Sequence, residues 1–178
     1  MKVISIWQPF ASLIVEGCKV FETRGWPAPA SVIGTRIGIA STKNIMPAQR
    51  SHCEDEAFKE FYERTGLDEW IELPRGYLLG TVVIDSVELM TEELMEEVSA
   101  EEQSYGWWDL GNYAWRLTNP IKLAEPIPIR GKQGLFEWNG DLPSVHTGKV
   151  QPDEETGEAS NPGRSERPQD IRRHLRAV

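Results

Sequence analysis

A short polar cluster near the N-terminus carries the residues best suited to chemistry. Lys19, Glu22 and Arg24 fall within six consecutive positions, just after Gly17. Side chains alternate between the two faces of a strand, so Glu22 and Arg24 should share one face, with Lys19 at the rim where the strand begins. The cations could hold a phosphate or carbonyl oxygen, and the glutamate could accept a hydrogen bond from an amine or act as a base toward water. An ion pair that ties the strand to its neighbour is the alternative.

The segments around this cluster predict a strand, a short helix, a glycine turn and a second strand. Residues 2–7 alternate as a strand does, residues 8–16 have helical periodicity with Gly17 as C-terminal cap, and residues 20–24 form the second strand. Trp7 and Gln8 stand at the corner between the first strand and the helix. The indole could fill the core or stack on a base, and the Gln8 amide offers both a donor and an acceptor to a base edge.

The rest of the chain predicts an α+β fold built on a small β-barrel. Further strands are expected at residues 36–41, 77–90, 113–117, 121–124 and 135–138, with helices at 47–64 and 92–99. The long apolar segment 77–90 is typical of a curved barrel strand. Residues 143–178 are rich in Ser, Pro, Gly, Glu and Asp, which predicts a flexible polar tail behind a single domain spanning residues 1–142.

Three segments of the chain together resemble a known family. They are Trp7-Gln8-Pro9-Phe10-Ala11, the Gly17, Lys19, Glu22 and Arg24 pattern, and residues 126–138. The combination resembles the activating signal cointegrator homology (ASCH) domain, which belongs to the PUA-like superfamily of small RNA-binding β-barrels. The resemblance implies a PUA-like barrel of about six strands with a few short helices. It also implies an RNA or modified-nucleoside ligand, held in a cleft beside the first helix by Trp7, Gln8, Lys19, Glu22 and Arg24.

Other polar and aromatic residues are candidates for the walls of that cleft. Ser41 and Lys43 end a predicted strand, and Trp107 lies in an aromatic loop flanked by glycines. Arg116 should face away from a buried Trp115, and Lys132 is expected to be a cation at the rim. For each of them the alternative is an ordinary core or surface position.

A hydrolase is the first alternative function. One branch of the family removes the acetyl group of N4-acetylcytidine with a lysine, a threonine and a glutamate. The lysine corresponds to Lys19, but the threonine falls at Glu22, and Thr23 is expected on the opposite face. Catalysis would then require Glu22 to activate water while Lys19 holds the developing oxyanion. The second glutamate of that branch has no assigned counterpart in this sequence, although Glu101 and Glu102 lie in the corresponding region. A ribonuclease, with Lys19 and Arg24 stabilising the transition state, is a further form of this alternative.

Composition limits the function classes that remain. The formal net charge of −9 argues against a broad basic surface that coats nucleic acid. The acidity is local, because nine acids and no Lys or Arg lie between Arg75 and Arg116. The acidic helix at 92–99 could dock a basic protein partner, which is the second alternative: a non-catalytic regulatory or interaction domain.

Several other features are expected to be absent. No metal-ligand spacing, phosphate-cradling glycine loop or catalytic serine elbow occurs, so neither a metal nor a cofactor is expected. No apolar run is long enough to span a membrane, and no signal peptide is recognisable. The two cysteines, Cys18 and Cys53, are expected to be free thiols, which is consistent with a cytoplasmic protein.

Overall fold

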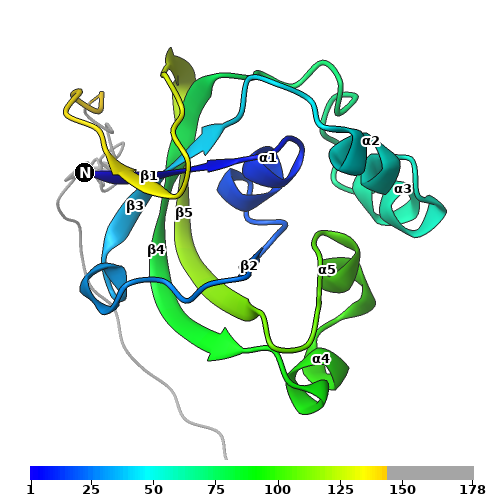
Figure 1. The fold of residues 1–178 in the computed structure, drawn as a ribbon. Coiled ribbons are helices and arrows are strands. Elements are labelled where there is room, and N and C mark those ends of the chain that lie inside the picture. The colour runs from blue at the N-terminus through cyan, green and yellow to red at the C-terminus, as the bar shows by residue number, and fades with distance from the viewer. Residues whose placement is uncertain (144–178) are drawn as a thin grey trace, which may run out of the picture. The chain divides into compact units, whose positions relative to one another are not determined.

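The computed structural model describes residues 1–143, which form one unit, and all of the predicted tail after Pro143 lies outside the described residues. Six strands form a single curled sheet, a half-barrel, in the order β2-β5-β4-β3-β1-β6 (Figure 1). The strands are β1 (Lys2–Ile6), β2 (Phe21–Arg24), β3 (Arg36–Ser41), β4 (Tyr77–Leu89), β5 (Tyr113–Pro128) and β6 (Leu135–Glu137). All neighbours pair antiparallel except β1 and β3. The predicted α+β fold with a small barrel-like sheet is confirmed.

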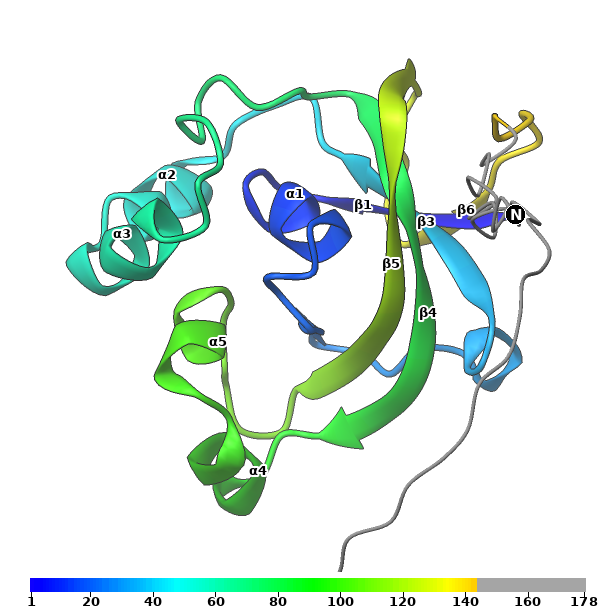
Figure 2. The same ribbon diagram turned by 180° about the vertical axis from the view of Figure 1, so that it is seen from behind.

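Helix α1 (Phe10–Val15) lies inside the curve of the sheet, between the strands and the remaining helices (Figures 1 and 2). Its residues are all buried, and Leu13 and Ile14 share one core cluster with Ile37, Ile39 and Ile84 of the strands. Gly17 follows the helix with φ +80°, a conformation that favours glycine, and it reverses the chain toward β2.

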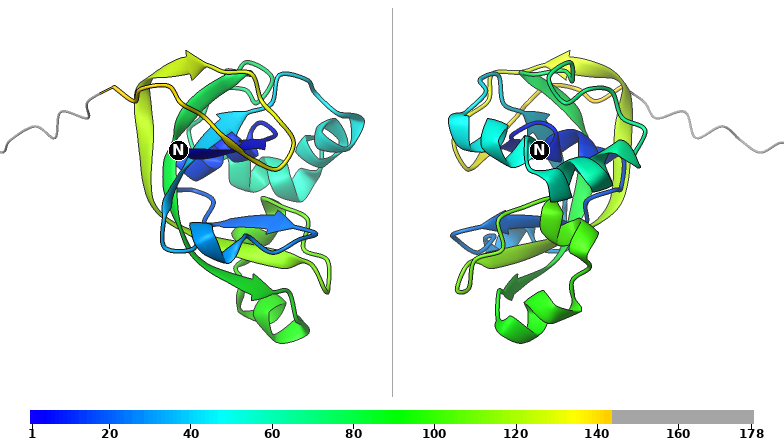
Figure 3. Two further views of the ribbon diagram at one scale, coloured as in Figure 1. Left: turned by 60° about the vertical axis from the view of Figure 1, so that its left-hand side comes forward. Right: turned by 90° about the vertical axis from the view of Figure 1, so that its right-hand side faces the viewer.

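Four short α-helices lie beyond α1 on the open side of the curl, as Figure 3 also shows. They are α2 (Pro47–Cys53), α3 (Glu56–Glu63), α4 (Glu92–Glu97) and α5 (Ala100–Ser104), and a 3-10 turn spans Ala30–Val32. The single helix predicted at 47–64 is two, because the Asp55 side chain accepts from the amides of Ala57 and Phe58 and starts α3 anew. Likewise α5 begins after α4 because the Ser99 hydroxyl accepts from the amide of Glu102.

The two strands predicted at 113–117 and 121–124 are one strand of 16 residues. Asn119 has φ +49° in its middle, and the register between β4 and β5 shifts at three places. Arg36 secures the irregularity, since its guanidinium donates to the Asn119 carbonyl at 2.9 Å and to the Thr81 hydroxyl at 3.0 Å. A bulged strand therefore continues through residues that resemble a turn in sequence.

Candidate functional site

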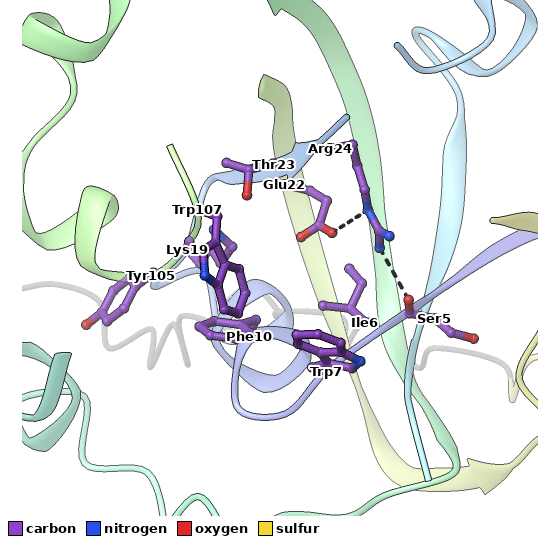
Figure 4. Close-up of a pocket in the computed structure, with 11 residues that line it drawn as sticks. Ser5, Ile6, Trp7, Phe10, Lys19, Glu22, Thr23, Arg24, Tyr105 and Trp107 are labelled. Atoms are coloured by element: carbon purple, nitrogen blue, oxygen red, sulfur yellow. Dashed lines mark hydrogen bonds and ion pairs between the residues drawn. The ribbon is translucent and has the colours of Figure 1, made fainter. Parts of the chain in front are cut away.

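A pocket of about 170 Å³ lies between the end of β1, the start of α1, β2 and the loop after α5 (Figure 4). It is called the first pocket below. Figure 4 shows Glu22 pointing into the space between Trp7, Arg24 and the Lys19–Trp107 side. The residues that line it are Ser5, Ile6, Trp7, Phe10, Lys19, Glu22, Thr23, Arg24, Tyr105, Gly106 and Trp107.

The carboxylate of Glu102, on α5, fixes the beginning of β2. It accepts hydrogen bonds from the backbone amides of Val20 at 2.9 Å and Phe21 at 3.0 Å. β2 is an edge strand paired with β5 alone, so these amides have no other strand to bind. The residue is only 5% exposed, and this burial raises the pKa of the Glu102 carboxyl, against the opposing effect of Lys19.

Lys19 is buried, not at the rim as the sequence predicts. Its side chain is 1% exposed, and its Nζ lies 3.5 Å from Glu102 Oε1. The ammonium has no hydrogen-bond partner among the described residues, although it can donate three. Lys19 also lines the first pocket, so its ammonium lies buried at the wall of that pocket.

Glu22 and Arg24 form an ion pair on one side of β2, as the alternation predicts. Arg24 Nε lies 2.7 Å from Glu22 Oε1, although its N–H is not aligned for a hydrogen bond, and Nη2 donates to the Ser5 carbonyl at 3.3 Å. The Glu22 side chain is 9% exposed and that of Arg24 is 25% exposed. This pair leaves Glu22 Oε2 available to accept from a ligand.

Trp7 and Trp107 form an aromatic wall. Their rings meet edge to face with centroids 5.6 Å apart, and Phe10 packs against Trp107 at 5.4 Å. Trp107 is 38% exposed, a large apolar surface to leave in water. Its neighbour Trp108 packs on Phe21 instead and donates to the Glu102 carbonyl at 3.3 Å.

Gly106 lets the chain pass close to two polar groups of the pocket. A β-carbon at this position would lie 3.1 Å from both Lys19 Nζ and Thr23 Oγ1. The ammonium and the hydroxyl are therefore on the same side of β2, facing the loop after α5. Thr23 lines the pocket together with Glu22, although neighbouring residues of a strand point to opposite faces. A four-residue strand at the edge of the sheet has pocket residues on both of its faces.

Two of the predicted cleft residues are engaged in the interior instead. Gln8 is fully buried, its Nε2 donates to the Pro74 carbonyl at 2.8 Å, and its Oε1 accepts from the Ser12 amide at 3.1 Å. This amide belongs to the first turn of α1, where backbone donors lack intrahelical partners. Ser41 is also buried, and its hydroxyl donates to the carbonyl and accepts from the amide of Tyr77.

Three predicted cations lie outside the first pocket. Lys43 is exposed and lies beside Gly76. Arg116 is stacked over the Phe21 ring at 4.6 Å and lies 3.6 Å from Glu88. Lys132 is exposed, with its Nζ 5.9 Å from the centre of the Phe136 ring. The structure thus brings together Trp7, Lys19, Glu22, Arg24 and Trp107, and leaves the other five candidates elsewhere.

Three residues that line the first pocket were not predicted from the sequence to do so: Thr23, Tyr105 and Gly106. Tyr105 is fully buried, its hydroxyl lies 3.1 Å from both the Phe61 carbonyl and the Glu101 carboxylate, and burial raises its pKa. A glycine between a tyrosine and two tryptophans was the available signal for this wall.

The remaining expectations concern the acidic surface of α4, metal ligands, the two cysteines and membrane-spanning helices. Glu92, Glu93, Glu96 and Glu97 are all exposed and none lines the first pocket, which favours a solubilising face for α4. Within residues 1–143, no three His, Cys, Asp or Glu side chains cluster closely enough to hold a metal ion, and Cys18 and Cys53 are both free. No helix in that part of the chain is long and apolar enough to cross a membrane.

A half-barrel sheet with an enclosed helix, and a polar pocket at the first strand–helix corner, define a small PUA-like domain. The sequence profile of the ASCH domain matches residues 4–127, and the chain belongs to this family. The PUA-like fold of the family is one generally used to bind RNA.

Individual relatives are distant. The chain is 25% identical over 143 residues to activating signal cointegrator 1 of Mus musculus and of Homo sapiens, a match that covers 78% of this chain and 22% of each relative. The chain thus spans about a fifth of the length of these curated relatives. A crystal structure of ASCH from Zymomonas mobilis is similar at 18% identity and a TM-score of 0.49, covering 78% of this chain and 87% of that one. A serine-to-alanine mutant of the same Zymomonas mobilis protein is similar at 21% identity and a TM-score of 0.48, with the same coverage.

Proposed function

We propose that this protein binds single-stranded RNA or a modified nucleoside by holding one base in the first pocket. The observation that carries the proposal is the buried Lys19 ammonium, which has no hydrogen-bond partner among residues 1–143 and borders the same pocket as the Glu22 carboxylate. A nucleobase edge presents hydrogen-bond acceptors and donors side by side, so an ammonium and a carboxylate on one wall complement it.

The aromatic wall and the pocket size support the same ligand. Trp7 and Trp107 offer ring surface on which a base can stack, a contact worth about 1–3 kcal/mol per base. The cavity of about 170 Å³ is smaller than the roughly 300–1,000 Å³ of pockets for drug-sized ligands. It therefore suits one flat ring, not a whole oligonucleotide. The two cations at the wall, Lys19 and Arg24, lie beside the carboxylates of Glu102 and Glu22, so the site is close to electrically balanced on an acidic protein.

The test is ligand binding by a matched pair of variants. Glu22→Gln keeps the shape of the side chain but removes the charge that receives a base donor. Glu88→Gln removes a similar acid, also paired with an arginine on a strand but outside the first pocket. Calorimetric titration with nucleosides, N4-acetylcytidine included, and with short single-stranded RNAs should show affinity roughly 10- to 100-fold weaker for Glu22→Gln. Affinity should be unchanged for Glu88→Gln, and equal losses in the two variants would refute a role for the pocket.

A hydrolase is the second candidate, and the position of Thr23 favours it. The Thr23 hydroxyl and the Lys19 ammonium both approach Gly106, so a threonine does stand beside the lysine in the pocket. Attack by this hydroxyl on an acyl carbon would need its proton removed, and Glu22 is the carboxylate of the wall that could accept it. As the C–N bond breaks, the leaving amine would take the proton from Glu22, and water would then hydrolyse the threonine ester, which releases the carboxylic acid and restores the hydroxyl.

Product analysis separates the candidates. Incubation with N4-acetylcytidine followed by mass spectrometry should show cytidine and acetate if the protein is an amidohydrolase, and this activity should vanish in Thr23→Val. Shortened RNA would instead indicate a ribonuclease. A bound, unaltered ligand identifies a binding domain, whereas neither binding nor turnover would favour a regulatory or protein-interaction domain.

A further inference from the structure

A second pocket lies on the other side of Trp107. Its volume is about 530 Å³, and its walls come from α2, the start of α3 and the end of α5. Trp107 lines both pockets. On the first side its ring meets Trp7 and Phe10 edge to face, and on the second it lies 4.6 Å from the His52 ring at a tilt of 45°. One indole thus borders both pockets.

The polar atoms of the second pocket are mainly acceptors. His52 Nε2 lies 2.7 Å from the Ser104 carbonyl, and a carbonyl only accepts, so Nε2 carries the proton and Nδ1 keeps a lone pair. Asp55 Oδ1 caps α3, which leaves Oδ2 to accept. Gln103 donates through Nε2 to the Met95 and Val98 carbonyls, which leaves its Oε1. Burial lowers the pKa of His52, which keeps the imidazole neutral near pH 7.

The same lining disfavours a phosphate. The described residues around the second pocket include the Asp55 carboxylate and no Lys or Arg, so a phosphate there would meet repulsion without a partner cation. A ligand that suits it carries several donors and an apolar face. The ribose hydroxyls and base amines of a ribonucleoside supply the donors, and Trp107 supplies a stacking surface.

We propose that the second pocket binds the nucleoside next in sequence to the base held in the first pocket, so that the ligand is a ribonucleotide strand of at least two residues that passes over Trp107. This inference rests on the proposed function and adds to it a second subsite and a preference for RNA. The larger volume fits a base with its sugar, whereas the first pocket fits a single ring.

Calorimetric titration with the four ribonucleosides, with ribodinucleotides of every sequence and with the corresponding 2′-deoxydinucleotides tests the inference. The Ala57→Trp variant fills the second pocket from an exposed position on α3 without touching the first. Ala100→Trp is the matched control, because Ala100 is also exposed in the first turn of a helix and lines neither pocket. Ser51→Trp, from exposed Ser51 on α2, fills the pocket if Ala57→Trp does not fold.

The expected result is that the best ribodinucleotide binds the unaltered protein roughly 5- to 100-fold more tightly than its nucleosides and than its 2′-deoxy form. The filled variants should lose this gain but keep the nucleoside affinity, and Ala100→Trp should keep both. If nucleosides bind but dinucleotides gain nothing, or gain equally in the filled variants, the second subsite is refuted while the first pocket stands. If no nucleoside or dinucleotide binds, the proposed function fails and the inference fails with it.

Discussion

Replacing the buried Lys19–Glu102 pair, one residue at a time and then together, should separate the structural role of Lys19 from its role toward a ligand. Lys19→Met leaves the Glu102 carboxylate buried without its cation. Glu102→Gln leaves the Lys19 ammonium without its anion, on a side chain that is only 1% exposed. Breaking a buried ion pair from one side typically costs about 3–5 kcal/mol, because an uncompensated charge remains.

The double variant Lys19→Met/Glu102→Gln should be markedly more stable than the sum of the single losses suggests. Both charges are gone, and the glutamine oxygen can still accept from one of the two amides, those of Val20 and Phe21, that Glu102 now binds. The remaining cost is one unpaired amide, about 1–3 kcal/mol. The coupling between the two positions should therefore exceed about 2 kcal/mol.

Urea denaturation of the four proteins at pH 8 measures this coupling, and titration with N4-acetylcytidine and single-stranded RNA completes the test. Stability should recover in the double variant, whereas ligand affinity should stay roughly 10- to 100-fold below that of the unaltered protein, because the pocket donor is still missing. Additive stability losses would refute a direct Lys19–Glu102 interaction. Recovery of affinity together with stability would show that Lys19 serves the fold alone.

Two more predictions concern the same region. Gly106→Ala places a methyl group 3.1 Å from Lys19 Nζ and Thr23 Oγ1, so ligand affinity should fall while the melting temperature changes little. Gly25→Ala is the control, because the methyl group added there meets only an ordinary contact at 3.6 Å. Burial raises the pKa of Glu102 above its ordinary 4.5, so the folded protein keeps a proton that the unfolded chain loses. The free energy of unfolding, relative to that of Glu102→Gln, should therefore fall as pH rises from 4.5 toward the raised pKa. Urea denaturation across this pH range measures the difference. If the free energy of unfolding rises with pH relative to that of Glu102→Gln, the attraction of Lys19 outweighs the effect of burial on the Glu102 pKa.

The order of elements could be predicted because their signals are local. Apolar alternation marks β1, β3 and β4, and Gly17 ends α1 as its position after Ile14 suggests. The predicted element bounds were wrong where a group distant in the sequence determines the backbone conformation. Arg36 holds the bulge at Asn119, 83 residues away in the sequence, so β5 continues through a segment that resembles a turn. No periodicity within residues 113–128 reveals that contact.

The candidate site was predictable to the extent that one segment supplies it. Lys19, Glu22 and Arg24 come from a single strand and its approach, and their proximity needs no tertiary information. Gln8 has a side chain equally suited to a ligand, but its amide group instead hydrogen-bonds to a free backbone amide of α1 and to the carbonyl of Pro74. A polar side chain next to the start of a helix can hydrogen-bond either to nearby backbone groups or to a ligand, and only the packed structure shows which of the two it does.

The pocket and the fold depend on one another through Glu102. This carboxylate binds the first amides of β2 and faces Lys19, and its helix, α5, leads directly into Tyr105, Gly106 and Trp107. The same contact therefore sets the position of the edge strand that carries Glu22 and Arg24 and of the loop that carries the aromatic wall. A ligand that moves Trp107 should therefore also displace β2, because α5 connects the two through Glu102. Conversely, loosening Glu102 should widen the pocket before it unfolds the sheet, because β3, β4 and β1 pair with one another without β2.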